Sequence, residues 1–259
     1  MSKRKACAAV VLALAGIAGI TLYRETLRPW MYTWGADDRE VTSTLPGDEM
    51  VTPDAPRTTR ALTIDAPPAT VWPWLAQIGE DRAGFYSYSV LERAVGARIH
   101  NADAVHPEWQ GVRVGDTIWL ARRYGERARQ LVAAVEPGSY LILVSPGDFA
   151  GLQRGRRAEG AWCFYLLPAD GATRLLIRGS GGVVGHAGFD IPHFIMEQKM
   201  MRGIRDRAQC RRTGPENQGC RATITGIRAA CRTAELTDPS SIPAKPPRPW
   251  LPTTTSCAV

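Results

Sequence analysis

The fold is decided at residues 189–207, which read FDIPHFIMEQKMMRGIRDR. Apolar residues recur there at helical spacing, so the segment is predicted to form one long amphipathic helix. Asp190 is expected to cap its start and Pro192 to lie in its first turn, while Gly203 is a weak position for a helix. The expected apolar stripe consists of Ile191, Phe194, Ile195, Met201 and Ile204. Such a stripe has to be buried against another layer of structure.

Shorter elements precede this helix. A strand predicted at 58–64 is followed by two short helices, at 65–78 and 87–95. Five further segments have the composition of strands; they are 116–121, 129–135, 140–144, 161–167 and 173–179. We therefore expect an α+β fold in which a curved antiparallel sheet packs on the long C-terminal helix, an arrangement that can leave a cavity between the two layers.

The net charge is +7 over 259 residues, but it is concentrated at the two ends of the chain. Lys3, Arg4 and Lys5 supply the excess at the N-terminus, and the residues from Cys210 onward supply the rest. The segment between them is neutral. A neutral body does not suit a nucleic-acid-binding domain, so we expect no nucleic-acid partner. The basic ends are suited to anionic lipid headgroups.

The sequence carries no strong catalytic, metal or cofactor motif. The six cysteines lack C-x-x-C spacing, and no histidine lies at a metal-ligand interval from them. His193 and Glu197 share a helix face, and such a pair is more often a solvated contact than a general acid and base. A second polar group falls in an expected surface loop; it consists of His100, Asp103, His106 and Glu108. We therefore predict no metal site and no cofactor, and we assign no catalytic residue.

Residues 6–23 contain no charged side chain and follow a basic N-terminus at residues 1–5. About 18 helical residues rise roughly 27 Å, close to the thickness of the hydrocarbon core of a bilayer. We favour a single-pass transmembrane anchor with the domain outside the cytoplasm, although Arg24 and Arg28 weaken that orientation. The alternative is a cleaved signal peptide, because Gly16-Ile17-Ala18 offers a cleavage site. A buried core helix fits this terminal segment less well.

Three segments follow the apolar run. Residues 24–56 show little apolar periodicity and are predicted to form a linker, with Trp30 either at the membrane interface or packed on the domain. Residues 57–208 contain all the predicted strands and form the folded domain. Residues 209–259 are interrupted by prolines and are predicted to be a disordered tail.

Several local motifs accompany the order of one strand, two short helices, antiparallel strands and a long final helix. They are Trp34-Gly35, Leu45-Pro46-Gly47-Asp48, Ala66-Pro67-Pro68, Val71-Trp72-Pro73-Trp74-Leu75, Gly84-Phe85-Tyr86-Ser87-Tyr88, His106-Pro107-Glu108 and Val114-Gly115-Asp116. With this element order, which is the helix-grip order, the chain resembles the SRPBCC superfamily of START-like and polyketide-cyclase-like proteins. It is similar in particular to bacterial membrane-anchored members of unassigned function. The resemblance covers roughly residues 30–208.

The resemblance implies that 57–208 is a helix-grip ligand-binding domain with a deep cavity suited to an apolar ligand. Aromatic side chains are the candidate ligand-binding residues, although ordinary core packing would explain them as well. They are Trp72, Phe85, Tyr86, Tyr88, Trp119, Trp162 and Phe194.

The leading hypothesis is a membrane-anchored domain that binds a hydrophobic small molecule or a lipid. One alternative is an enzyme of the cyclase or hydratase type that uses the same cavity. It requires His193, Glu197 or Tyr86 to point inward beside another titratable group. The other alternative is an envelope interaction protein with a closed core and no ligand. The sequence indicates no oligomeric state.

Overall fold

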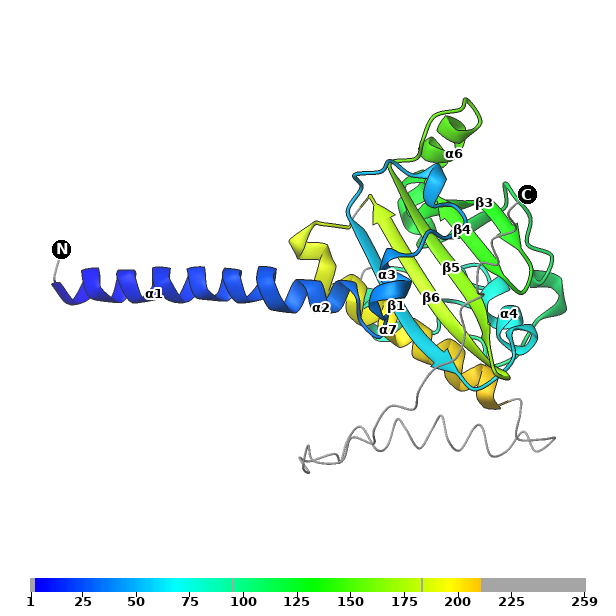
Figure 1. Cartoon of the computed structure of the whole chain (residues 1–259), viewed down its shortest axis with the longest axis horizontal. Helices are drawn as coiled ribbons and strands as arrows, with labels where there is room; N and C mark the ends of the chain where they lie inside the picture. The colour runs from blue at the N-terminus through cyan, green and yellow to red at the C-terminus, as the bar shows by residue number, and fades with distance from the viewer. Residues whose placement is uncertain (1–2, 95, 183, 211–259) are drawn as a thin grey trace, which may run out of the picture. The chain divides into compact units, whose positions relative to one another are not determined.

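A computed structural model describes residues 3–94, 96–182 and 184–210. Six strands form one antiparallel sheet in the order β1-β6-β5-β4-β3-β2 (Figure 1). The strands are β1 Arg57–Ile64, β2 Thr117–Trp119, β3 Arg129–Glu136, β4 Tyr140–Val144, β5 Gly160–Ala169 and β6 Ala172–Gly181. The sheet is curved, and a register shift between Val132 and Ala134 of β3 adds to its bend.

The order of strands and helices matches the expected one, with further helices before β1 and between β4 and β5. The helices are α1 Lys3–Leu22, α2 Arg28–Tyr32, α3 Asp38–Thr42, α4 Pro68–Ala76, α5 Ser89–Ala94, α6 Pro146–Leu152 and α7 Ala187–Cys210, with the shorter turns η1 Tyr23–Leu27, η2 Asp48–Met50, η3 Pro107–Trp109 and η4 Arg122–Ala128. β1 is followed by α4 and α5, then by β2 to β6, and α7 comes after the last strand. The predicted α+β arrangement of an antiparallel sheet and a long C-terminal helix is confirmed.

The inner face of the sheet is covered by α7 and α4. Side chains alternate between the two faces of a strand, so Phe164 of β5 and Ile177 of β6 point to this face. There they join one apolar core with Met201 and Ile204 of α7. Figure 1 shows α7 running behind the sheet, and the helix packs against both β1 and α4. The burial of its apolar side chains is what holds α7 on the sheet.

The prediction that Asp190 caps the long helix is wrong. α7 begins at Ala187, so Asp190 lies inside its first turn. The Asp190 carboxylate instead accepts hydrogen bonds from the hydroxyls of Tyr23 and Tyr32, each at 2.9 Å, and forms an ion pair with Arg28. Tyr23, Arg28 and Tyr32 thus contact one buried carboxylate. Asp190 therefore holds the segment that follows α1 against the start of α7.

The predicted apolar stripe of α7 is correct at Phe194, Met201 and Ile204, which are buried, and wrong at Ile191 and Ile195. Ile191 and Ile195 are 42% and 41% exposed, and Pro192 lies beyond the first turn. The buried positions there include Glu197 and Met200. The buried face of α7 thus includes Glu197, whose carboxylate has a charged partner inside the domain, as described below.

The outer face of the sheet is also apolar and is covered by residues from the predicted linker 24–56. Val51 joins a second buried cluster with side chains of β1, β4, β5 and β6. Arg178 of β6 donates to the main-chain oxygen of Glu40 and forms an ion pair with Asp48. Arg174, also of β6, forms an ion pair with Glu40. This part of the chain thus contains short helices that pack on the sheet.

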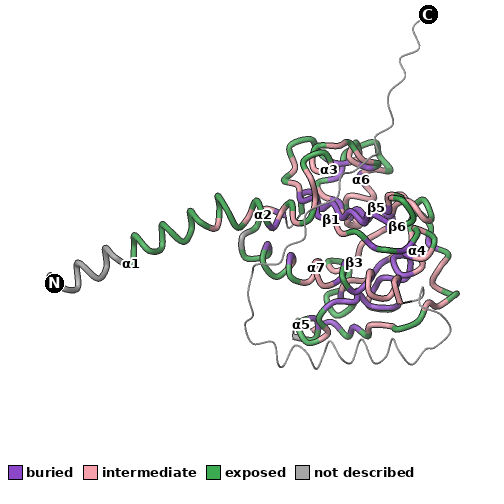
Figure 2. The backbone as a smooth tube through the Cα atoms, turned by 60° about the horizontal axis from the view of Figure 1, so that its bottom comes forward, coloured by how far each residue is buried: buried purple, intermediate pink, exposed green. Residues whose placement is uncertain are grey.

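α1 and η1 cover the predicted anchor at residues 6–23. The large apolar side chains described in α1 are each at least 60% exposed (Figure 2); they are Leu12, Leu14, Ile17, Ile20 and Leu22. Across the residues that the structure describes, no helix has both the length and the hydropathy needed to cross a membrane. The side chains of residues 3–11, and residues 211–259 of the predicted tail, lie outside that description.

Candidate functional site

A cavity of about 680 Å³ lies beside the N-terminal half of α7, at the end of the sheet where β5 begins and β6 ends. Six residues of α7 line it, and the residues opposite come from α5, η4, β3, α6, β5, β6 and the loops that join them. The α7 residues are Phe189, Pro192, His193, Met196, Glu197 and Met200. The predicted cavity between the sheet and the long helix is therefore present.

Four glycines line the cavity at this end of the sheet; they are Gly160 of β5, Gly179 and Gly181 of β6, and Gly182. Close packing requires glycine at three of these positions. A Cβ at Gly160 would lie 2.7 Å from the Ser180 main-chain oxygen, one at Gly179 would lie 2.9 Å from Thr58 Oγ1, and one at Gly181 would clash with the Glu159 main-chain oxygen. Gly181 also has a φ of +58°, which favours glycine at that position.

Aromatic rings form one wall. Trp162 of β5 lies 6.1 Å from the ring of Phe85 and 4.7 Å from the ring of Phe164, measured between centroids. Phe85 and Trp162 line the cavity directly. Such a wall offers a large apolar contact area for a ligand.

A buried ion pair closes one side of the cavity. Arg60 of β1 pairs with Glu197 of α7, and both side chains are 1% exposed. The indole Nε1 of Trp162 donates to the other Glu197 oxygen at 2.8 Å, and Arg60 Nε donates to the Met31 carbonyl at 2.7 Å. Each carboxylate oxygen of Glu197 therefore has a donor. A buried pair satisfied in this way links β1 to α7 and fixes the rotation of the helix.

His193 lies next to this pair. Its Nδ1 is 3.4 Å from Arg60 Nη1, and because a guanidinium can only donate, Nδ1 acts as the acceptor. Burial lowers the pKa of His193 below its ordinary value, so the ring is mostly neutral at pH 7 and carries its proton on Nε2. The neutral ring presents an N–H donor at the cavity wall.

Glu92 of α5 and Asp148 of α6 also line the cavity. Of these two carboxyls, Glu92 has the unusual surroundings. It is 1% exposed, and among the described residues neither of its carboxyl oxygens has a hydrogen-bond partner. Burial raises the pKa of Glu92 to about 7. Neither Glu92 nor Arg60 stands out in the sequence, because a charged residue on a short helix or in a strand is usually exposed.

The seven predicted ligand-binding residues do not converge on one site. Phe85 and Trp162 line the cavity. Trp72 is buried in the core, and Tyr86 is buried with its hydroxyl donating to the Trp74 carbonyl at 3.0 Å.

The other three lie elsewhere. Phe194 packs edge-on against Trp30 and Trp34, away from the cavity. Tyr88 is 43% exposed, and Trp119 stacks under Arg122 and Arg129.

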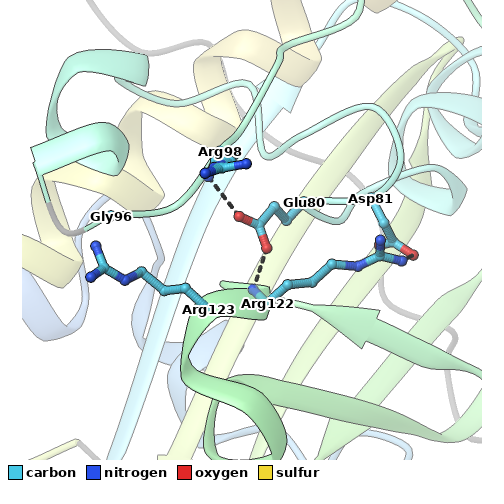
Figure 3. A pocket seen from close by; sticks show the side chains of 6 residues that line it. All are labelled: Glu80, Asp81, Gly96, Arg98, Arg122 and Arg123. Atoms are coloured by element: carbon cyan, nitrogen blue, oxygen red, sulfur yellow. Dashed lines mark hydrogen bonds and ion pairs between the residues drawn. The ribbon is translucent and has the colours of Figure 1, made fainter.

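A second hollow on the surface is polar (Figure 3). The main-chain N–H groups of Arg98 and Arg122 donate to the Glu80 carboxylate, and the guanidinium of Arg122 pairs with Asp81. Figure 3 shows the Arg122 and Arg123 side chains pointing in opposite directions, so their charges do not converge on one point. These contacts hold three loops together. Among the described residues, no three His, Cys, Asp or Glu side chains gather as a metal site requires.

The two alternative functions can be weighed against this geometry. The enzyme hypothesis requires an inward titratable group beside another, and Glu197 meets that requirement through Arg60 and His193. Both Glu197 oxygens are however occupied by donors within the fold. The closed-core hypothesis conflicts with a cavity of this size, because protein cores contain few voids larger than a water molecule.

No family model matches the chain, and no curated protein sequence matches it either. Solved structures similar to it include a protein from Nitrosomonas europaea, 11% identical, covering 60% of this chain and 94% of that one with a TM-score of 0.38. A Polyketide_cyc-like protein from Corynebacterium glutamicum is 17% identical, with 69% and 88% covered and a TM-score of 0.28. An AHSA1-like protein from Rhizobium etli is 19% identical, with 65% and 91% covered and a TM-score of 0.33.

At such identities and TM-scores these likenesses carry nothing about ligand or reaction.

Proposed function

We propose that this protein binds an apolar small molecule or a lipid in the cavity between α7 and the sheet. The observation that carries the proposal is the cavity itself: about 680 Å³, walled by Phe85, Trp162, Met196 and Met200. Ligand pockets of proteins usually have volumes of about 300–1,000 Å³ and mostly apolar walls with a few polar groups. Both features are present here.

We further propose that α1 anchors the protein in a lipid membrane. The proposal is supported by the uncharged sequence of residues 6–23 and by the exposed apolar side chains of α1. An apolar surface that runs the length of a helix is unfavourable in water and is covered by partner protein or lipid. Lipid is favoured because three basic residues precede the helix.

The binding proposal is tested on the full chain purified in detergent. Bound molecules are extracted with organic solvent and quantified by mass spectrometry. Met196 lines the cavity, so Met196→Trp should fill part of it and reduce the amount of the specific ligand roughly tenfold.

Ile195→Trp is the matched control. It makes the same substitution one residue earlier on α7, where the side chain is 41% exposed. Lipid that merely surrounds α1 would be equal in both variants. Identical extracts from wild type, Met196→Trp and Ile195→Trp would contradict binding in the cavity.

A further inference from the structure

Three carboxyl side chains line the same cavity but have different surroundings. Asp148 accepts hydrogen bonds from the Ser145 hydroxyl and the Glu159 main-chain N–H. Glu197 receives hydrogen bonds from Arg60 and Trp162. Glu92, on the short helix α5, is equally buried, and the part of the chain that the structure describes offers its oxygens no hydrogen-bond donor. Within this cavity the fold thus supplies donors to Glu197 and Asp148 and, among the described residues, none to Glu92.

A buried carboxyl without a partner is unfavourable. Burying a polar group without a hydrogen bond costs about 1–3 kcal/mol in proteins, and a charged group costs more. Gln or Leu at position 92 would avoid the charge. The buried Glu92 carboxyl is therefore explained best if a ligand donates a hydrogen bond to it.

We propose that Glu92 binds the polar head of the ligand, and that this head is a hydrogen-bond donor, either an ammonium or a hydroxyl. The inference rests on the proposed function, since it names the ligand class of the same cavity. The apolar body of such an amphiphile would lie along Phe85, Trp162 and Met200, which line the cavity with Glu92. An ammonium would form a charge-assisted hydrogen bond with the ionised carboxylate, and a hydroxyl would donate to either carboxyl form.

The test uses three photoreactive probes with the full chain in phosphatidylcholine nanodiscs. The probes share one alkyl chain carrying a diazirine and differ only in the end group, which is an ammonium, a hydroxyl or a methyl. After irradiation, mass spectrometry of peptides quantifies the label on cavity-lining segments, such as 85–99 and 189–200. Wild type is compared with Glu92→Gln and Glu92→Leu.

We expect the ammonium or the hydroxyl probe to label the cavity of the wild type roughly tenfold more than the methyl probe. Glu92→Leu should remove that preference and leave methyl-probe labelling unchanged. Glu92→Gln separates the two heads, because the amide oxygen accepts from either one but carries no charge. Labelling by the hydroxyl probe should therefore persist, while labelling by the ammonium probe should fall with the loss of the ion pair.

Two results would overturn the assignment of Glu92. One is equal cavity labelling by all three probes in the wild type. The other is a head preference that persists in Glu92→Leu. In both cases labelling of the cavity itself would still support the proposed function. If no probe labels the cavity in any variant, the proposed function fails as well, so the two failures are distinguishable.

Discussion

A buried carboxyl without a partner makes the stability of the folded chain depend on pH. Burial raises the pKa of Glu92 from the ordinary value of 4.5 to about 7. The folded state therefore holds this proton more tightly than the unfolded state does. It follows that the free energy of unfolding falls as the pH rises through the interval between 4.5 and about 7, and stays low above it.

Glu92→Gln should remove this loss of stability at high pH, because the amide does not ionise. At pH 9 we expect the variant to be more stable than the ligand-free wild type by up to about 3 kcal/mol, and the difference should vanish near pH 4. Denaturant unfolding of the full chain at several pH values measures it. Glu136→Gln, at an exposed position, is the control and should show no such trend. A wild type and a Glu92→Gln variant whose difference does not change with pH would contradict the raised pKa.

Single residues of the site could be predicted from the sequence only in part. Trp162 and Phe85 were expected at the cavity and are there. Phe194 was expected there and packs on Trp30 instead, because composition shows that a residue is apolar but not which of two apolar surroundings it enters. The Arg60–Glu197 pair could not be predicted, since its partners are 137 positions apart in the chain.

At the scale of elements, Gly203 marks the contact between α7 and the loop that carries Tyr86. A Cβ at position 203 would lie 2.7 Å from the Tyr86 Cβ, closer than real contacts of this kind. Tyr86 has little freedom to move, because Asn101 accepts from its main-chain N–H and its hydroxyl donates to the Trp74 carbonyl. The weak helix position seen in the sequence is therefore required by close packing.

Gly203→Ala should destabilise the domain by about 1–3 kcal/mol through overpacking, despite the better helix propensity of alanine. Denaturant unfolding of the full chain checks this. Gly188→Ala is the control on the same helix, since a Cβ at Gly188 meets nothing within 4 Å. That variant should be unchanged or slightly more stable. The packing argument fails if Gly203→Ala is as stable as Gly188→Ala.

The elements themselves were predictable where the apolar period was clear. The run Tyr140–Val144 was predicted as a strand with the bounds that β4 has. The start of α7 was missed because Asp190 resembles a helix cap in sequence, whereas its real partners are Tyr23, Arg28 and Tyr32, more than 150 residues earlier. Local propensity cannot anticipate a contact over that separation.

At the scale of the whole molecule, the sequence of β4 indicates that both faces of the sheet are covered. Leu141 and Leu143 belong to the inner cluster, while Ile142 and Val144 belong to the outer one. An apolar run without alternation requires a layer on each side. The predicted long helix covers only one face of the sheet. The layer on the other face comes from residues 24–56, which show little apolar periodicity, so the sequence pattern did not predict it. Arg174 and Arg178 fix that layer through polar contacts, and hydropathy patterns do not report these.

Attachment of the whole protein to a membrane through α1 makes a separate prediction. Introducing two carboxylates, Leu14→Glu with Ile17→Glu, should release the protein into the soluble fraction after cell lysis, because each charge in the centre of a membrane helix costs about 2.5–3.5 kcal/mol. Val114→Glu, on a 55% exposed apolar side chain of the domain, is the control and should leave the wild-type distribution unchanged.

Intact-mass measurement of the same samples separates an anchor from a cleaved signal peptide. A retained anchor predicts a membrane-bound chain that still includes residues 6–23, with the Tyr23–Asp190 hydrogen bond joining the end of that segment to α7. Cleavage after Ala18 would remove the apolar run and leave a chain whose distribution no longer depends on positions 14 and 17. A soluble wild-type chain of full mass would contradict the membrane proposal. Ligand binding would be judged independently, because the residues that line the cavity begin at Phe85, well after α1.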